Sequence, residues 1–259
     1  MTDERFIVRP FDPSADMPRL HQLSMEVVAT DQEPNNDIEE ALYAQHDMPG
    51  HDPVRDRTVV VAAADPEKVI GYSLTWLPPG TKKAYAHVVV HPGWRRQGLG
   101  SALLQQVLAH SRSLDAAQVN LYASYQHDGA NALLRKHGFK PAGAYTEMSA
   151  SSSLRHPPIT WPYGYKMRTY AEAGSLAILT QVYNEAYQFL PGHHTVSQEQ
   201  VAKWLPSFDL EGLCLVFSEK NRPVGVSRVE MSRERSLRNC APTGYIDAPG
   251  ISSPHRRLD

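Results

Sequence analysis

A glycine-rich turn at residues 91–100, His-Pro-Gly-Trp-Arg-Arg-Gln-Gly-Leu-Gly, constrains the fold of this chain more than any other segment. An apolar run, Ala84 to Val90, comes before it, and the segment after it has apolar residues at three- and four-residue spacing. This order predicts a strand, a tight turn and an amphipathic helix. The first turn of a helix carries unpaired N–H groups and partial positive charge, and Gly98 and Gly100 let a ligand approach the main chain. The turn is therefore expected to bind an anion such as a pyrophosphate.

Three glycine-rich motifs compete for this turn. A P-loop requires Gly-Lys-Ser/Thr, and the chain has Gly-Leu-Gly-Ser instead. A dinucleotide-binding turn expects a small residue where Leu103 stands. The third motif, Arg-x-x-Gly-x-Gly after an apolar strand that ends in Val-His-Pro, is matched by Arg95, Gly98 and Gly100. On these residues the segment resembles the coenzyme A site of the GCN5-related N-acetyltransferases.

That resemblance implies an α/β fold over about residues 4–150, a mixed sheet with helices on both faces. The hydrophobic pattern predicts elements in an order that suits it, with Gly138 closing the last helix. The expected strands are 6–10, 58–63, 69–77, 83–90, 119–125 and 140–146, and the expected helices are 16–30, 37–46, 98–113 and 128–137.

The resemblance also implies acetyl-CoA as acetyl donor and no metal. The pantetheine arm would pair with the backbone of the strand before the turn, and the pyrophosphate would lie on the turn itself. Asn131 is a further candidate for a hydrogen bond to the pantetheine. The predicted cofactor-binding residues are Val88, Val89, Val90, Arg95, Arg96, Gln97, Gly98, Leu99, Gly100, Ser101 and Asn131.

An acetyl acceptor must be a neutral amine, so the site needs a base. His87 is the predicted base, because it lies one residue before the cofactor-pairing segment and imidazole titrates close to neutral pH. An ordinary strand histidine is the alternative interpretation. Glu26 and Glu147 are less specific carboxylate candidates, and His91 is expected to have a structural role.

The chain departs from the family where a tyrosine commonly protonates the leaving thiolate. Leu134 stands at that position and His127 replaces an asparagine. Leucine cannot donate a proton. Tyr125 is the predicted acid, with Tyr122 or solvent as alternatives.

The acceptor side is marked by an acidic segment with no Lys or Arg between Glu26 and His46. A negative rim would concentrate a cationic amine, whereas the plainer alternative is a solvated, acidic helix start. The acidic residues are Glu26, Asp31, Glu33, Asp37, Glu39 and Glu40.

The chain repeats itself loosely, with an offset of 161 residues between Arg95 and Arg256. The pattern predicts a complete acetyltransferase domain over 1–150, a Ser/Pro-rich linker over 151–162, and a truncated second copy over 163–259 that lacks the pyrophosphate turn. Leu213–Phe217 and Val224–Val229 are expected to form sheet in that copy. The strand interrupted by Pro249 is expected to be weak. The second copy would then be a packing or dimerising element, which makes a homodimer possible.

The composition excludes several other classes of protein. Charge is nearly balanced, with 26 Lys and Arg against 28 Asp and Glu, and no basic tract suits a nucleic acid. No apolar stretch is long enough to span a membrane, and the two cysteines, Cys214 and Cys240, indicate a reducing cytoplasm. The chain is therefore predicted to be a cytoplasmic N-acetyltransferase that acts on a primary amine of a small molecule or peptide. A non-catalytic acyl-CoA-binding or scaffold protein is the alternative.

Overall fold

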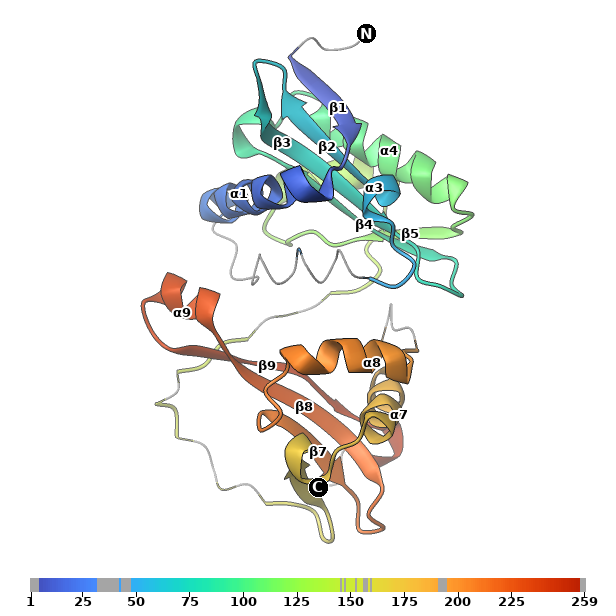
Figure 1. Cartoon of the computed structure of the whole chain (residues 1–259), viewed down its shortest axis with the longest axis vertical. Coiled ribbons are helices and arrows are strands. Elements are labelled where there is room, and N and C mark those ends of the chain that lie inside the picture. The colour runs from blue at the N-terminus through green and yellow to red at the C-terminus, as the bar shows by residue number, and fades with distance from the viewer. Residues whose placement is uncertain are drawn as a thin grey trace. The chain divides into compact units, whose positions relative to one another are not determined.

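The computed structural model describes residues 5–31, 42, 48–144, 146, 148–151, 153–155, 158, 160–190 and 195–256. The chain divides into two compact units, Met1–Pro141 and Ala142–Asp259 (Figure 1). Each unit is built on its own sheet. No described helix is long and apolar enough to cross a membrane.

The first unit contains a five-stranded sheet in sequential order β1-β2-β3-β4-β5. The first four strands are antiparallel to their neighbours, and β5 is parallel to β4. A parallel neighbour requires a crossover connection, which α4 supplies. The strands are β1 (Phe6–Pro10), β2 (Arg57–Ala62), β3 (Asp65–Trp76), β4 (Lys83–Val90) and β5 (Gln118–Leu121).

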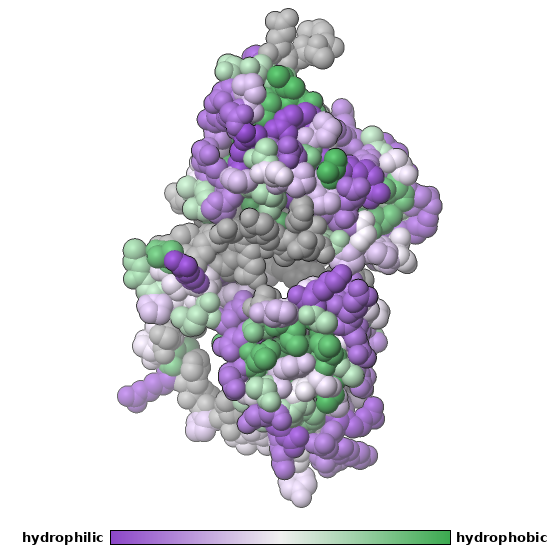
Figure 2. Space-filling model, in the orientation of Figure 1, coloured by the Kyte–Doolittle hydropathy of each residue, from purple (hydrophilic) through white to green (hydrophobic). Residues whose placement is uncertain are grey.

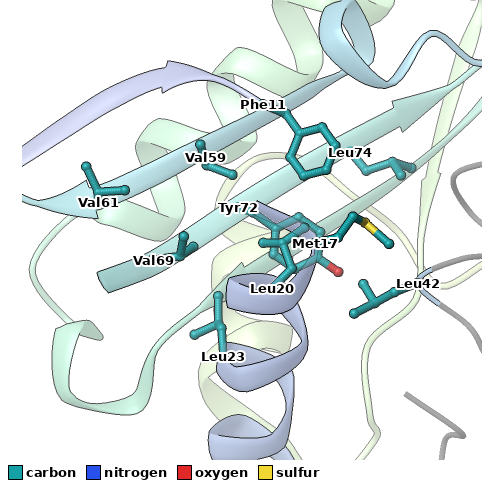
Figure 3. Packing of buried hydrophobic residues seen from close by; sticks show 10 residues of the cluster. All are labelled: Phe11, Met17, Leu20, Leu23, Leu42, Val59, Val61, Val69, Tyr72 and Leu74. Atoms are coloured by element: carbon teal, nitrogen blue, oxygen red, sulfur yellow. The ribbon is translucent and has the colours of Figure 1, made fainter. Parts of the chain in front are cut away.

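Helices cover both faces of this sheet. Leu20 and Leu23 of α1 pack on one face, in a cluster that includes Val59 and Tyr72 (Figure 3). Leu99 and Leu103 of α4 pack on the other face with Ile70. The predicted mixed α/β fold is therefore confirmed. The helices are α1 (Pro13–Asp31), α3 (Pro53–Asp56), α4 (Leu99–Ser113) and α5 (Asp128–Lys136), with a 3-10 turn, η1, at Pro92–Trp94.

Two predicted strands differ from the structure. The strand expected at 119–125 is confined to Gln118–Leu121, because its pairing with β4 ends at Leu121. The strand expected at 140–146 is wrong for residues 140–144, which are irregular. Pro141 cannot donate to a ladder there. The helix expected at 37–46 falls almost wholly outside the described residues, apart from residue 42.

The second unit contains a four-stranded antiparallel sheet in the order β6-β7-β8-β9. Its core lies between the sheet and the helices α7 and α8. The elements are β6 (Lys166–Thr169), α6 (Tyr170–Ala173), α7 (Leu176–Tyr187), α8 (Gln198–Trp204), η2 (Leu205–Ser207), β7 (Leu213–Phe217), β8 (Pro223–Ser232), α9 (Arg233–Asn239), β9 (Thr243–Ile251) and η3 (Ser253–His255). In the view of Figure 2, apolar residues gather on the visible face of this unit within a hydrophilic border.

The sheet predicted for the second unit is confirmed, but its last strand is better formed than expected. β9 runs over nine residues despite Pro249. It lies at an edge of the described sheet, and the ladder with β8 shifts register between Val226 and Arg228, opposite the proline. Edge strands and bulges are the places where a sheet tolerates proline.

The two sheets repeat each other over four strands. The order β6-β7-β8-β9 matches β1-β2-β3-β4, and a 3-10 turn follows the last strand of each set. The backbone N–H of His91 donates to the carbonyl of Ile70 at 2.8 Å, and that of Ser252 donates to the carbonyl of Val224 at 2.8 Å. The repeat seen in the sequence thus has a structural counterpart in hydrogen bonding.

Candidate active site

The edge of β4 is paired along only half of its length on the β5 side. Pairing with β5 stops at Ala86 and Leu121, whereas pairing with β3 continues to Val90. Residues 87–90 therefore have no described strand neighbour on that side. A sheet edge of this kind presents main-chain donors and acceptors to an extended ligand.

Backbone N–H and carbonyl groups point to alternate sides of β4, and this alternation shows which residues present them to the open edge. The N–H of His91 faces β3, and the carbonyl of Val89 approaches Gly71 on that strand. Backbone groups alternate in direction along a strand, so those of Val88 and Val90 face the open side. The carbonyl of Val90 already accepts from Arg95 Nε at 3.2 Å. Val88 is therefore the residue that can offer both its N–H and its carbonyl to a ligand at the open edge.

The turn after β4 exposes the start of α4. Arg96 and Gly98 have φ values of 63° and 89°, so the chain passes twice through the left-handed region. Gly98 caps α4 without a side chain, and the first helical bond runs from Ala102 N–H to the Gly98 carbonyl at 3.0 Å. The N–H groups of residues 99–101 lie before this bond and have no helical acceptor. Together with the helix dipole they make this turn chemically suited to an anion.

Gly100 has a packing reason to be glycine. A Cβ atom there would lie 3.2 Å from Leu133 Cδ2 and 3.8 Å from Val90 Cγ2. The start of α4 therefore approaches α5 closely, beside the end of β4.

Arg95 is held by an ion pair that sequence analysis missed. Its two terminal nitrogens bind Asp31 at 2.6 and 2.8 Å. His127 accepts from Ala130 N–H through Nδ1, and its Nε2 lies 3.3 Å from both Asp31 Oδ2 and Arg95 Nη1. The hydrogen bond from Arg95, with smaller contributions from His127, lowers the pKa of Asp31 below its ordinary value. Asp31 had been grouped with the acidic rim, and no local pattern joins it to a residue 64 positions away.

Glu26 and His91 form a second contact between α1 and the end of β4. His91 accepts from Gly93 N–H through Nδ1, and its Nε2 lies 2.7 Å from Glu26. Both ring nitrogens of His91 are therefore occupied, in line with its expected structural role. Burial raises the pKa of Glu26, but hydrogen bonds from Gln22 and His91 lower it overall.

His87 lies on the face of β4 that α1 covers. Its ring stacks on Tyr72, with centroids 5.7 Å apart and planes 9° apart. His87 is an exposed residue of the strand, yet desolvation of its ring and the positive charge of the buried Arg57 both lower its pKa. Both effects favour the neutral imidazole that a general base requires.

The other predicted site residues are less well placed. Tyr125 and Tyr122 follow the end of β5, and they are 95% and 68% exposed. The amide nitrogen of Asn131 donates to the carbonyls of Ser124 and His127, both at 2.9 Å, so it stabilises its own loop. Glu147 lies outside the described residues, as do Glu33, Asp37, Glu39 and Glu40. Within the described part of the chain, no group of three His, Cys, Asp or Glu side chains suits a metal.

Residues 55–141, which include the open edge and the turn, match the family model of the acetyltransferase (GNAT) domain. The chain belongs to the GCN5-related N-acetyltransferase superfamily. A mycothiol acetyltransferase from Mycobacterium avium is 32% identical over 178 residues, which cover 67% of this chain and 54% of the relative. The mycothiol acetyltransferase of Mycolicibacterium smegmatis is 28% identical over 187 residues, which cover 64% and 55%.

The chain spans about half the length of the curated relatives that it matches. Among solved structures, a GCN5-related N-acetyltransferase from Sphaerobacter thermophilus aligns with 99% of this chain and 79% of its own, at a TM-score of 0.72 and 21% identity. That similarity concerns the fold of the superfamily.

Proposed function

We propose that this chain is an acetyl-CoA-dependent N-acetyltransferase in which a primary amine attacks the acetyl group directly, in a ternary complex. One observation carries the proposal: the half-open edge of β4 leads into a turn whose N–H groups converge at the start of α4. An extended arm that ends in a pyrophosphate needs both features, side by side and in this order.

The residues present fit such a cofactor. Val88 offers the strand-like pairing to the pantetheine arm, and the turn from Arg96 to Ser101 offers N–H groups to the pyrophosphate. The left-handed conformation of Arg96 costs on the order of 1–2 kcal/mol, and such strain is often found at functional sites. Bound acetyl-CoA supplies the activated acyl group.

The protein supplies orientation and proton transfer. An alkylammonium has a pKa of about 10, so the acceptor must lose a proton before it attacks. His87 is the proposed base, because its lowered pKa keeps the ring neutral near pH 7. Tyr125 is proposed to donate a proton to the departing thiolate, since Leu134 cannot. Its 95% exposure leaves solvent as the alternative donor.

The relatives point to a class of acceptor to test first. The matched proteins are named mycothiol acetyltransferases, and they share up to 32% identity with this chain. We therefore propose a small-molecule amine, with the acceptor of those enzymes as the first member of a panel that also contains peptide N-termini.

The test measures binding and turnover separately. Acetyl-CoA at about 100 times its Kd should stabilise the first unit by about 2.7 kcal/mol, with one site per chain by calorimetry. One amine of the panel should release free thiol. Gly98→Glu places a carboxylate at the turn, on a backbone with φ of 89°, and should abolish both effects. Equal stabilisation of wild type and variant would remove the cofactor from this turn.

A non-catalytic acyl-CoA-binding protein is the second candidate. The leucine at position 134 and the 95% exposure of Tyr125 favour it, because leucine cannot donate a proton and an exposed tyrosine is poorly shielded from water. This candidate predicts the same stabilisation by coenzyme A but no thiol release with any amine.

A further inference from the structure

The two units share an arginine that follows the 3-10 turn. Arg95 follows η1 in the first unit, and Arg256 follows η3 in the second. Each donates its Nε to the carbonyl of the last residue of the preceding strand, to Val90 at 3.2 Å and to Ile251 at 2.7 Å. The two arginine side chains therefore make the same hydrogen bond to the strand that precedes them.

Each arginine also reaches the end of a helix that packs on the same sheet. Arg95 binds Asp31, the last residue of α1, and Arg256 Nη2 donates to the carbonyl of Ala186 near the end of α7 at 2.9 Å. The second unit thus uses this residue to join the end of a strand to the end of a helix. A contact that both units make belongs to the framework of the fold.

In the first unit each of the three guanidinium nitrogens makes a hydrogen bond within the protein. Nε binds the Val90 carbonyl, and both terminal nitrogens bind the carboxylate of Asp31. His127, the N-cap of α5, contacts the same carboxylate at 3.3 Å. Asp31 has only 10% of its side chain exposed, and Arg95 only 26%. A bidentate pair of this geometry neutralises the charge that a phosphate would need.

We propose that Arg95 is a positioning residue rather than a phosphate ligand. Together with Asp31 and His127, it ties the end of α1 to the end of β4 and to the start of α5. α1 covers the face of β4 that carries His87. These contacts therefore fix the position of the acceptor side of the site relative to the cofactor-binding edge. This inference rests on the proposed acetyltransferase function.

The test compares Arg95→Gln, Arg95→Lys and Asp31→Asn in the full chain. If Arg95 positions α1, all three variants should raise hydrogen exchange in the last turn of α1 by about tenfold, while the Kd of coenzyme A changes by less than about threefold. Lysine is a decisive variant, since it keeps the charge but cannot make the bidentate pair. The double variant Arg95→Gln/Asp31→Asn should be no worse than either single one.

A phosphate ligand would give the opposite pattern. Arg95→Gln would then weaken coenzyme A by roughly tenfold or more and reduce the salt dependence of its Kd, whereas Arg95→Lys and Asp31→Asn would largely preserve binding. That result would overturn the inference. Arg256→Gln is the matched control, expected to destabilise the second unit without changing the Kd. If Gly98→Glu still binds coenzyme A normally, the proposed function fails instead.

Once an acceptor is found, the same variants give a kinetic readout. The positioning role predicts a rise in the KM of the amine of roughly five- to twentyfold, with a smaller change in the KM of acetyl-CoA. An unchanged amine KM in all three variants would contradict the proposal.

Discussion

In the first unit β4 pairs with β3 on one side and, along its first half, with β5 on the other, whereas in the second unit β9 has one described neighbour, β8. Both strands nevertheless end in a 3-10 turn and an arginine with the same backbone contact. Features that the units share are therefore explained by folding alone. Features confined to the first unit, such as His87 and the Asp31–His127 contact, are the better candidates for a part in building the site.

The two units also differ in the charged side chains that they bury. Among the described residues, charged side chains that are nearly inaccessible to solvent occur in the first unit at Asp16, Asp56 and Arg57. The buried polar residues described in the second unit are all serines. The units should therefore respond differently to pH as well as to ligand.

The largest expected effect comes from making the first unit resemble the second at one position. The internal repeat aligns His87 with Ala248. His87→Ala should lower kcat by roughly 10²- to 10⁴-fold near pH 7, because the amine loses its base. Activity should partly return at high pH, where more amine is neutral, and the Kd of coenzyme A should stay close to that of wild type. A pH–rate profile of the same shape in both proteins would place the base elsewhere.

A second large effect concerns Asp56, which accepts from Arg55 at 2.7 and 2.8 Å and contacts His110 at 2.8 Å. Asp56→Asn should destabilise the first unit by about 3 kcal/mol at pH 7, since it leaves buried partners unpaired. The unfolding free energy of each unit is measured by denaturant titration. Asp52→Asn, at an exposed cap where asparagine can accept the same hydrogen bonds, is the control and should cost less than about 0.5 kcal/mol.

The pH dependence of this effect has a definite sign. Burial raises the pKa of Asp56, but hydrogen bonds from His51, Arg55, His110 and a backbone N–H lower it well below its usual range. A depressed pKa in the folded state stabilises above the unfolded value of about 3.9, and this stabilisation is lost as the pH falls below it. The difference between wild type and Asp56→Asn should therefore shrink below pH 4. A difference that is constant from pH 7 to pH 3 would contradict this account.

A moderate effect tests a feature that the units share. Gly71 and Gly225 lie opposite the last residues of β4 and β9. A Cβ atom on Gly71 would lie 3.1 Å from the Val89 carbonyl oxygen, and one on Gly225 would lie 3.2 Å from the Gly250 carbonyl oxygen and closer still to Cδ1 of Ile251. Alanine at either position should cost about 1–2 kcal/mol. Gly143→Ala, which meets no atom within 4 Å, is the neutral control. A loss of stability in one unit alone would show that the two units differ more in packing than their shared hydrogen bonds suggest.

The smallest effect is expected in α9, which the second unit inserts between β8 and β9. Cys240 caps this helix with φ of 50°, a conformation that favours glycine. Cys240→Gly should stabilise the second unit by about 0.5 kcal/mol, because relief of the left-handed strain exceeds the entropy that glycine loses on folding. Destabilisation in a thermal scan would mean that the side chain makes a contact that matters more.

Local patterns predicted most of the fold. β1, β4 and β7 match their expected ranges because alternating or continuous apolar residues mark them from end to end. The predicted end of β5 was wrong because β4, not its own sequence, decides where pairing stops. The strand expected at 140–146 was wrong for a related reason, since an apolar pattern is not enough where Pro141 has no ladder to join.

The candidate site likewise has a part that the sequence predicted and a part that it did not. The turn from Arg96 to Ser101 was predicted because its glycines, its strand and its helix are adjacent in the sequence. The partner of Arg95 was not, because Asp31 is far away along the chain and resembles any other residue of an acidic segment. Stacking of His87 on Tyr72 likewise depends on strand register, which the sequence pattern alone leaves open.

The half-paired edge of β4 also bears on how long the protein survives in a cell. An unpaired strand edge can template pairing with another chain, which is a route to aggregation. A bound cofactor that occupies residues 87–90 would close that route as well as take part in the reaction. Depletion of acyl-CoA would then leave the protein not merely idle but more exposed to misassembly and proteolysis. Metabolic state would in this way influence abundance through the same four residues that are proposed to line the cofactor.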